Sequence, residues 1–423
     1  MKVVTRDLSH LEKFVRTLEL MYQHRRANPT SRSDELYYGM LARYFRRVLD
    51  APGQGHKVVA HTVFVPNELF AAFDLVPLHL ESLAVIMVPT LKNSDEVLGA
   101  AKGFGIPVEI CSAHRSQAGL FVQGWVPAQA VLWSHQICDS SSKSGELLAE
   151  LYHIPSFFMD RPYNYGDRDA LYYSQEMNSA IGFLEEVSGQ KADWERLEQA
   201  VEYSRQMVEL HREIYELRQA VPCPSPNRLG TQLMFAGFLW MGTPEGVSYF
   251  QACRDELRER VGQKRGFIPQ ERFRIVSIFP PPAHKWKLLD WLEREHGAVV
   301  VADPYCSHWG PVEWNEKRPL LTLARKYFAS PLSRQMHGPA AIGWIPDSVE
   351  DALSHQAEGA VYWAHIGCRH GCSTIKMIKD ALLEKAGIPM LVIDIDVLDP
   401  TFVTEEELRE KLEGFLEMLE TRK

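Results

Sequence analysis

The first part of the chain repeats apolar residues at intervals of three or four positions. This spacing is followed by Leu8, Leu11, Phe14, Leu18 and Met21. It gathers apolar side chains on one face of a helix. We therefore predict a helical arm over residues 1–50, which would act as a lid or in dimerisation.

A second pattern begins near residue 51, where short β-branched runs alternate with amphipathic stretches. Examples of the runs are "VVAHTVFV", "IPVEIC" and "AVLWSHQIC", and after residue 271 "FRIVSIF", "AVVVADPYC" and "GAVYWAHIGC". Apolar strand, loop and helix in repetition are typical of a parallel sheet covered on both faces. We predict an α/β protein with two doubly wound parallel-sheet domains of similar plan, residues 51–167 and 271–423. A connector of long helices over residues 168–270 would join the two domains.

Charge and hydropathy exclude two classes of partner. With 46 Lys and Arg against 55 Asp and Glu, the net charge is −9, which argues against nucleic acid because phosphate binding requires a basic surface. No apolar run approaches the ~20 residues that cross a bilayer, and the N-terminus lacks a signal-peptide core. The sequence therefore predicts a cytoplasmic protein without a membrane partner.

The seven cysteines are the main candidates for chemistry. A reducing compartment disfavours a disulfide framework, which leaves buried small residues, metal or cluster ligands, and redox groups. Ligands of open parallel sheets bind beyond the carboxyl ends of the strands. Four of the cysteines directly follow predicted strands, and these are Cys111, Cys138, Cys306 and Cys368. Cys372 comes about one helical turn after Cys368.

Spacing separates the kinds of cysteine site. The paired spacing of structural zinc sites is absent, and Cys368 and Cys372 enclose three residues where the redox motif has two. Iron–sulfur clusters accept thiolates from distant segments, so the residues favour a cluster. Cys223, which lies between prolines, and Cys253, at a helical position, are more typical of structural cysteines.

Other polar residues near these positions have two interpretations each. Glu68 lies in a first helical turn, where it would stabilise the helix dipole or act as a proton donor. The residues that flank the cysteines would donate hydrogen bonds to cluster sulfides or pass protons, or else be ordinary loop residues, and these are His114, Arg115, His135, His365, Arg369 and His370. With Glu68, His114 and His365 are the candidates for a catalytic role. No Walker-type phosphate loop is present, so we expect ATP hydrolysis to lie elsewhere.

Several motifs in order resemble the iron–sulfur subunits of the 2-hydroxyacyl-CoA dehydratase and benzoyl-CoA reductase superfamily. They are "FVPNELFAAFDLVPLHLE", "CSAHRSQAGL", "SHQICDSSSK", "IPSFFMDRPY", "GFLEEVSGQK", "HIGCRHGC" and "GIPMLVIDIDVLDP", from about His61 onward. The resemblance implies that Cys111, Cys138 and Cys368 are the cluster ligands. It also implies a separate ATP-hydrolysing iron–sulfur activator protein as the electron donor.

The number of cysteines bears on the branch of this superfamily. A single 4Fe-4S cluster would use the three cysteines above, whereas a sulfide-bridged double cubane (8Fe-9S), which one similar branch carries, needs six. Here the six would be the trio with Cys306, Cys372 and either Cys253 or Cys223. We expect an oxygen-sensitive, ATP-dependent iron–sulfur reductase of the double-cubane type that acts on a small molecule as a homodimer.

Two alternatives stay open. The chain would be an (R)-2-hydroxyacyl-CoA dehydratase subunit with one 4Fe-4S cluster, or a non-catalytic electron-relay subunit. Phe73 and Asp74 stand where many dehydratase subunits have a glycine. The cations Arg115, Lys143, Arg161 and Arg369 are isolated and form no compact pocket for the diphosphate of CoA.

Overall fold

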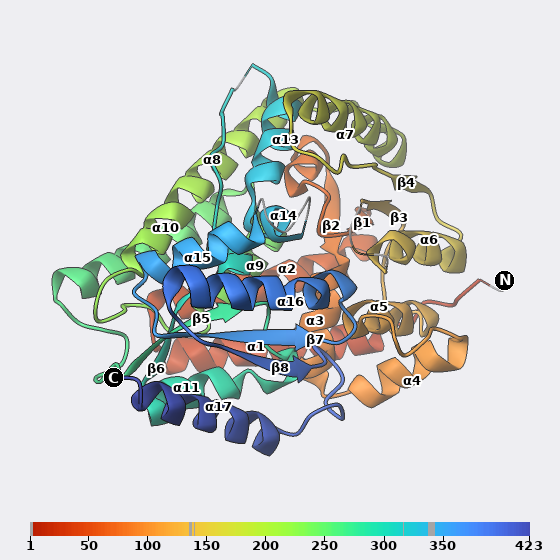
Figure 1. Cartoon of the computed structure of the whole chain (residues 1–423). Helices are drawn as coiled ribbons and strands as arrows, with labels where there is room; N and C mark the ends of the chain where they lie inside the picture. The colour runs from red at the N-terminus through yellow and green to blue at the C-terminus, as the bar shows by residue number, and fades with distance from the viewer. Residues whose placement is uncertain (1–2, 135–137, 139, 316, 337–342) are drawn as a thin grey trace. The chain divides into compact units, whose positions relative to one another are not determined.

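The computed structural model describes residues 3–134, 138, 140–315, 317–336 and 343–423 (Figure 1). The chain forms two compact units, each assembled from three segments. Unit 1 consists of Met1–Met207, Phe235–Tyr249 and Pro311–Phe328, and unit 2 of Val208–Met234, Phe250–Gly310 and Ala329–Lys423.

Parallel strands and surrounding helices make up each unit. The elements of unit 1 are α1 (Ser9–Ala27), α2 (Arg32–Asp50), η1 (Ala51–Gln54), β1 (Lys57–His61), η2 (Asn67–Ala72), β2 (Leu75–His79), α3 (Leu80–Leu91), α4 (Ser94–Phe104), α5 (Ser112–Val122), β3 (Ala130–Trp133), α6 (Ser141–Tyr152), β4 (Ser156–Phe158) and α7 (Asp167–Ser188). Those of unit 2 are β5 (Phe273–Ile278), η3 (Ala283–Lys285), α11 (Lys287–His296), β6 (Ala298–Ala302), α12 (Pro304–Ser307), α14 (Pro331–Met336), α15 (Trp344–Ser354), β7 (Gly359–His365), α16 (Arg369–Ala381), η4 (Leu382–Ala386), β8 (Met390–Ile395) and α17 (Glu405–Glu420). The residues of four further helices are divided between the units, and these are α8 (Trp194–Leu217), α9 (Leu229–Trp240), α10 (Pro244–Gly262) and α13 (Pro319–Ala329).

The sheet of unit 1 is parallel, with the strand order β2-β1-β3-β4. Its inner strands are buried on both faces, which explains their continuous apolar runs. The order reverses between β1 and β3, and this is where open sheets bind ligands. There Thr62 Oγ1 donates to the Ser134 carbonyl (2.9 Å) and accepts from its N–H (3.0 Å), which joins the two strand ends.

The sheet of unit 2 repeats this plan with the order β6-β5-β7-β8, again parallel. Helices α15 and α16 cover one face, and α11 and α17 cover the other (Figure 1). The last helix starts at a capping box, in which the Thr404 side chain accepts from Glu407 N–H and the Glu407 carboxylate accepts from Thr404 N–H. The prediction of an α/β fold with two similar parallel-sheet domains is confirmed.

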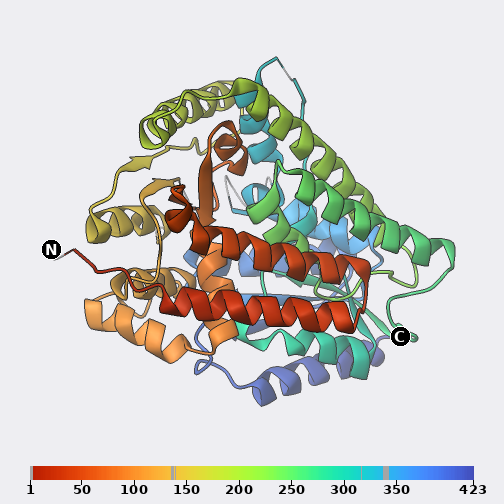
Figure 2. The same cartoon turned by 180° about the vertical axis from the view of Figure 1, so that it is seen from behind.

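The predicted N-terminal helix is a pair of helices in unit 1, α1 and α2, which lie side by side (Figure 2). The buried face of α1 carries Leu11, Phe14 and Leu18, as the spacing predicted. Tyr44 of α2 donates a hydrogen bond to the Pro77 carbonyl of β2 (2.9 Å), so the pair is attached to the sheet. Within the described part of the chain, no helix is both long and apolar enough to span a membrane.

Candidate functional site

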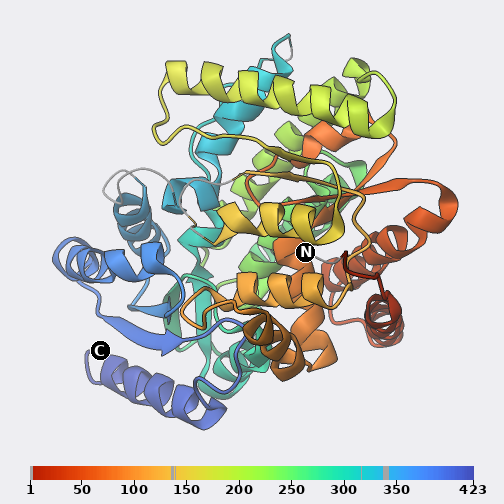
Figure 3. The same ribbon diagram turned by 90° about the vertical axis from the view of Figure 1, so that its right-hand side faces the viewer.

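Two of the predicted ligands of unit 1, Cys111 and Cys138, meet at one imidazole. Cys111 is the N-cap residue of α5, and Cys138 lies in the segment that connects β3 to α6. The Cys138 sulfur is 3.9 Å from His114 Nδ1 and 4.0 Å from Nε2, and the Cys111 side chain also interacts with this ring. Both thiols are partly exposed. Helices α5 and α6 lie side by side (Figure 3), so segments remote in sequence bring the two sulfurs to the same place.

A carboxylate lies behind this imidazole. Glu81, in the first turn of α3, places Oε1 3.8 Å from His114 Nε2. Burial lowers the pKa of His114, but the negative charge of Cys138 and hydrogen bonds to Cys111, Cys138 and Glu81 outweigh it, so the pKa is well above the usual value of 6.5. The ring thus lies between sulfur and carboxylate, which both favour its protonated form.

The cysteines of unit 2 lie at the start of α16. Cys368 is the N-cap residue, and its sulfur accepts from Gly371 N–H at 3.4 Å. Cys372 is one turn further along the helix, and its thiol donates to the His365 carbonyl (3.3 Å). The unpaired N–H groups at a helix start favour negative charge, which suits thiolates and an anionic cluster. Burial and the nearby Asp394 raise the pKa of Cys372, so without a metal its thiol keeps its proton more readily than an exposed thiol does.

Aromatic rings surround the start of α16. Phe279, directly after β5, has a left-handed backbone (φ 69°), which is strained for a residue with a side chain. Its ring contacts those of Tyr305 (4.9 Å between centroids) and Trp344 (5.9 Å). A Cβ atom at Gly371 would lie 3.3 Å from the Phe279 ring and 3.4 Å from the Cys368 sulfur. Glycine therefore lets this helix turn approach the ring and the sulfur closely.

The other three cysteines are buried. The Cys306 thiol of α12 contacts the Met234 sulfur (3.8 Å), and burial together with Asp303 raises its pKa well above the usual value. Cys223 packs beside the Ser225 hydroxyl (3.4 Å), and burial raises its pKa as well. Cys253 in α10 is fully buried. Four of the seven thiols are therefore partly exposed, and three are in the protein interior.

Glu68, the predicted proton donor, is a buried partner in an ion pair. One oxygen, Oε1, interacts with the Lys326 ammonium and accepts from the Ser204 hydroxyl (2.5 Å). The other oxygen has no hydrogen-bond partner among the residues that the structure describes. Both charged side chains are almost fully buried. The position of Glu68 in a first helical turn gave no indication of Lys326, which is 258 residues away in the sequence.

The flanking residues differ in their surroundings. His365 ends β7 and is buried, whereas His370 contacts the Gln335 carbonyl (3.2 Å) and stacks on Trp344. Burial lowers the pKa of His370. Arg115 is buried and donates to the Ile110 carbonyl (3.0 Å). His135 lies outside the described residues, and Arg369 is the first residue of α16.

Two of the cations considered for a diphosphate, Arg161 and Lys143, have very different surroundings. Arg161 is fully buried among the rings of Phe64, Tyr173 and Tyr327, at 5.0–5.5 Å from their centroids. Lys143 is exposed and pairs with Glu146 on the same helix (3.2 Å).

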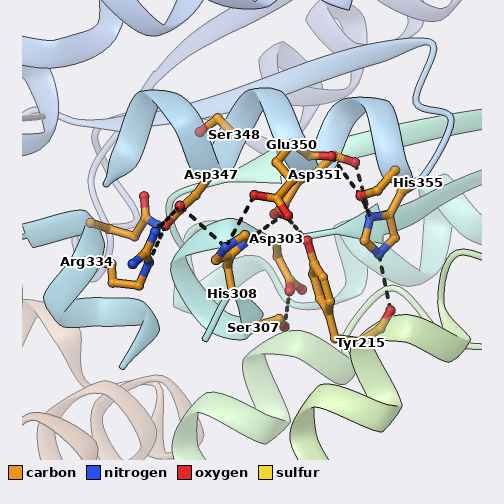
Figure 4. A network of polar contacts seen from close by, with 12 residues as sticks. Tyr215, Asp303, Ser307, His308, Arg334, Asp347, Ser348, Glu350, Asp351 and His355 are labelled. Atoms are coloured by element: carbon orange, nitrogen blue, oxygen red, sulfur yellow. Dashed lines mark hydrogen bonds and ion pairs between the residues drawn. The ribbon is translucent and has the colours of Figure 1, made fainter. Parts of the chain in front are cut away.

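Unit 2 also contains a buried polar network that the sequence did not reveal (Figure 4). His308 Nδ1 is 2.9 Å from Asp351, which also accepts from the Tyr215 hydroxyl. Asp347 binds the Arg334 guanidinium through both oxygens, and His308 Nε2 is 3.4 Å from it. Burial raises the pKa of Asp351, while the hydrogen bond to Asp351 and both carboxylate charges raise that of His308 against the effect of burial. The network ties α14 to α15.

No group of three or more His, Cys, Asp or Glu side chains is arranged around a single metal position in the part of the chain that the structure describes. The four partly exposed thiols lie two in each unit, Cys111 and Cys138 in unit 1 and Cys368 and Cys372 in unit 2. Partly exposed thiols at helix starts are soft, charge-compensated donors, and these fit an iron–sulfur cluster better than a hard metal ion.

Comparison with known proteins decides the family. The family model "2-hydroxyglutaryl-CoA dehydratase, D-component" matches residues 62–419. The chain belongs to this family. The match begins directly after β1 and includes all the other strands, all seven cysteines, Glu68 and Glu81, and it confirms the resemblance found in the motifs.

The relatives include a reductase subunit and dehydratase subunits. A benzoyl-CoA reductase subunit of Thauera aromatica is 24% identical over 416 residues, which cover 91% of this chain and 94% of the relative. The (R)-2-hydroxyisocaproyl-CoA dehydratase alpha subunit of Clostridioides difficile is 24% identical over 402 residues (91% and 95%). The (R)-phenyllactyl-CoA dehydratase alpha subunit of Clostridium sporogenes is 23% identical over 400 residues (89% and 92%). The chain is thus related along its length to subunits of reductases and of dehydratases.

Proposed function

We propose that the chain is the iron–sulfur subunit of a low-potential reductase or dehydratase, and that Cys111, Cys138 and Cys368 hold the cluster. The supporting observation is the environment of these sulfurs, since all three are partly exposed beside a helix start or an imidazolium. Such surroundings stabilise thiolates. When bound, the cluster would supply one-electron transfer.

The polar groups around these thiols would tune and shield that chemistry. The N–H groups at the start of α16 and the cationic ring of His114 offset negative charge. The rings of Phe279, Tyr305 and Trp344 would exclude water on the side of Cys368. The electron donor would be a separate ATP-hydrolysing iron–sulfur protein, and the complex would work in the cytoplasm.

The burial of Cys306, Cys223 and Cys253 favours a single 4Fe-4S cluster over the double cubane, because fewer than six thiols are accessible. The acyl-CoA names of the relatives favour a CoA thioester as the substrate, with a second subunit in the complex. A single specific observation supports the double-cubane reductase as the second candidate. Cys372 is a fourth partly exposed thiol, and a cluster held by three thiolates gives it no role.

The test is the iron and acid-labile sulfide content of anaerobically purified chain. About four irons per chain support the single cluster, and about eight support the double cubane. Cys368→Ala should lose the cluster in both cases, whereas Cys372→Ala and Cys306→Ala should lose iron only with the double cubane. Cys253→Ser serves as the control for the single cluster. A wild-type chain without iron would contradict the proposal.

A further inference from the structure

Glu81 connects three segments of unit 1 that are separate in sequence. Its Oε2 accepts from Val63 N–H in the loop after β1 (3.2 Å), and its Oε1 is 3.4 Å from the Ser141 hydroxyl at the start of α6. The same Oε1 is 3.8 Å from His114 Nε2 on α5. The side chain is 14% exposed, so these contacts have little competition from water.

The segments that Glu81 connects are those that carry the cysteines. Helix α5 starts directly after Cys111, and α6 starts three residues after Cys138. His114 lies between Glu81 and the Cys138 sulfur. Glu81 is also 3.9 Å from His79 Nδ1, which accepts from Ser82 N–H and is thereby fixed at the end of β2. A carboxylate on a rigid strand-to-helix turn thus anchors the imidazole that faces the sulfur.

We propose that Glu81 is a positioning residue that holds His114, and with it the segments of Cys111 and Cys138, in the arrangement that receives the cluster. Glu81 does not touch the sulfurs and acts through His114 and through the loop of Val63. This inference deepens the proposed function and rests on it. It gives Glu81, which is not itself a ligand, a role in the binding of the cluster. In metal sites, a carboxylate bonded to a metal-ligating imidazole fixes the orientation of the ring, and Glu81 is placed in the same way toward His114, which contacts the thiols.

Glu81→Gln is the most specific variant, because glutamine keeps the shape and an oxygen that can accept from Val63 N–H, and loses only the charge. We expect the iron of Glu81→Gln to be lost to a chelator about 10- to 100-fold faster than that of the wild type. The reduction potential of the cluster should shift upward, because a negative charge near it is removed. A purely structural role would leave the potential unchanged.

The matched control is Glu146→Gln. Glu146 is an exposed carboxylate on α6 that pairs with Lys143 on the same helix. Glu146→Gln also removes one negative charge from a helix of unit 1, but it removes no contact with His114. Iron retention and the reduction potential of the cluster should therefore equal those of the wild type. Equal changes in both variants would overturn the role of Glu81.

A second experiment needs no cluster. In the metal-free chain, Glu81→Ala removes the acceptor of Val63 N–H and the anchor of His114. We expect backbone hydrogen exchange to become about tenfold faster or more in residues 62–65, 112–116 and 140–144. Each of these segments contains one residue, Val63, His114 or Ser141, that loses its contact with the Glu81 carboxylate. Exchange in β8 of unit 2 should not change.

The two experiments separate this inference from the proposed function. A wild-type chain that holds iron, with Glu81→Gln like the wild type, overturns the role of Glu81 alone. A wild-type chain without iron contradicts the proposed function, and the exchange experiment then still decides whether Glu81 positions the segments of the two cysteines. Unchanged exchange in Glu81→Ala overturns the inference in either case.

Discussion

The ion pair between Glu68 and Lys326 gives the sharpest test of how the interior of unit 1 is built. Both side chains are removed from water, with 0% and 3% of their surfaces exposed. Loss of one partner leaves an uncompensated buried charge, which costs about 3–5 kcal/mol. Either Glu68→Gln or Lys326→Met should therefore destabilise unit 1 by this amount.

The double variant separates the pair from its surroundings. Glu68→Gln with Lys326→Met removes both charges of this pair, and the glutamine oxygen can still accept from the Ser204 hydroxyl. Replacement of a buried pair by neutral groups of similar volume is often close to neutral. We expect the double variant to be more stable than either single variant, with a coupling energy of about 3 kcal/mol or more.

The assay is guanidinium unfolding, followed by hydrogen exchange of the β1 and α13 peptides so that unit 1 is observed by itself. With an m-value of about 5 kcal/mol/M, a loss of about 4 kcal/mol lowers the midpoint by about 0.8 M. Single variants within about 1 kcal/mol of the wild type, or a double variant whose loss equals the sum of the single losses, would refute the reasoning. The same variants test the predicted proton donor, because a double variant that is stable and active would show that the reaction does not need the Glu68 carboxyl group.

Three further perturbations follow from local contacts. Burial raises the pKa of Glu293 from 4.5 to about 7, so the folded chain binds the extra proton and stability falls as pH rises through this window. Glu293→Gln should be more stable than the wild type by up to about 3 kcal/mol at pH 8 and equal to it near pH 5, which thermal melts across pH will check. A Cβ atom at Gly145 would lie 2.3 Å from the Trp133 ring, so Gly145→Ala should cost about 1–3 kcal/mol and lower iron uptake, whereas Gly182→Ala, with open space around it, should gain up to about 1 kcal/mol. Thr404→Ala removes the cap of α17 and should cost about 1 kcal/mol in denaturant melts, without effect on iron content.

The apolar pattern was sufficient to predict the two sheets and the places of Cys138, Cys306 and Cys368 after strands. It was wrong for Cys111, because the run "IPVEIC" forms no strand and Cys111 follows a turn at the start of α5. Strands of a parallel sheet are buried on both faces, and this burial requires continuous β-branched runs. The runs therefore indicate directly which segments are buried strands. Cys138 and Cys368 lie just beyond β3 and β7, which occupy the same place in the two strand orders. A cysteine that follows a strand within a few residues can be placed from the sequence, because only neighbouring positions are involved.

The burial of individual thiols depends on contacts that sequence spacing does not contain. Cys306 follows β6 as predicted, yet Met234, 72 residues earlier, covers its sulfur. Glu81 was missed for the same reason, since a glutamate in a first helical turn is ordinary and its partners Val63, His114 and Ser141 come from three other segments. Tertiary contacts, and not the residue types, distinguish a cysteine that can bind a cluster from one that is buried in the core.

The repeated strand order explains why thiols of both units have similar surroundings. In each unit a segment leaves the third strand of the parallel order and enters a helix, and a cysteine occupies that segment. The helix start then supplies N–H groups, as at Gly371 for Cys368, whereas the Cys138 segment relies on the imidazole of His114. Since the helix dipole is fixed by the backbone and the imidazole depends on Glu81, removal of the carboxylate should affect the cysteines of unit 1 and leave those of unit 2 unchanged. Alkylation rates of the metal-free chain, measured cysteine by cysteine in Glu81→Gln, will test this asymmetry, and a change at Cys368 equal to that at Cys138 would contradict it.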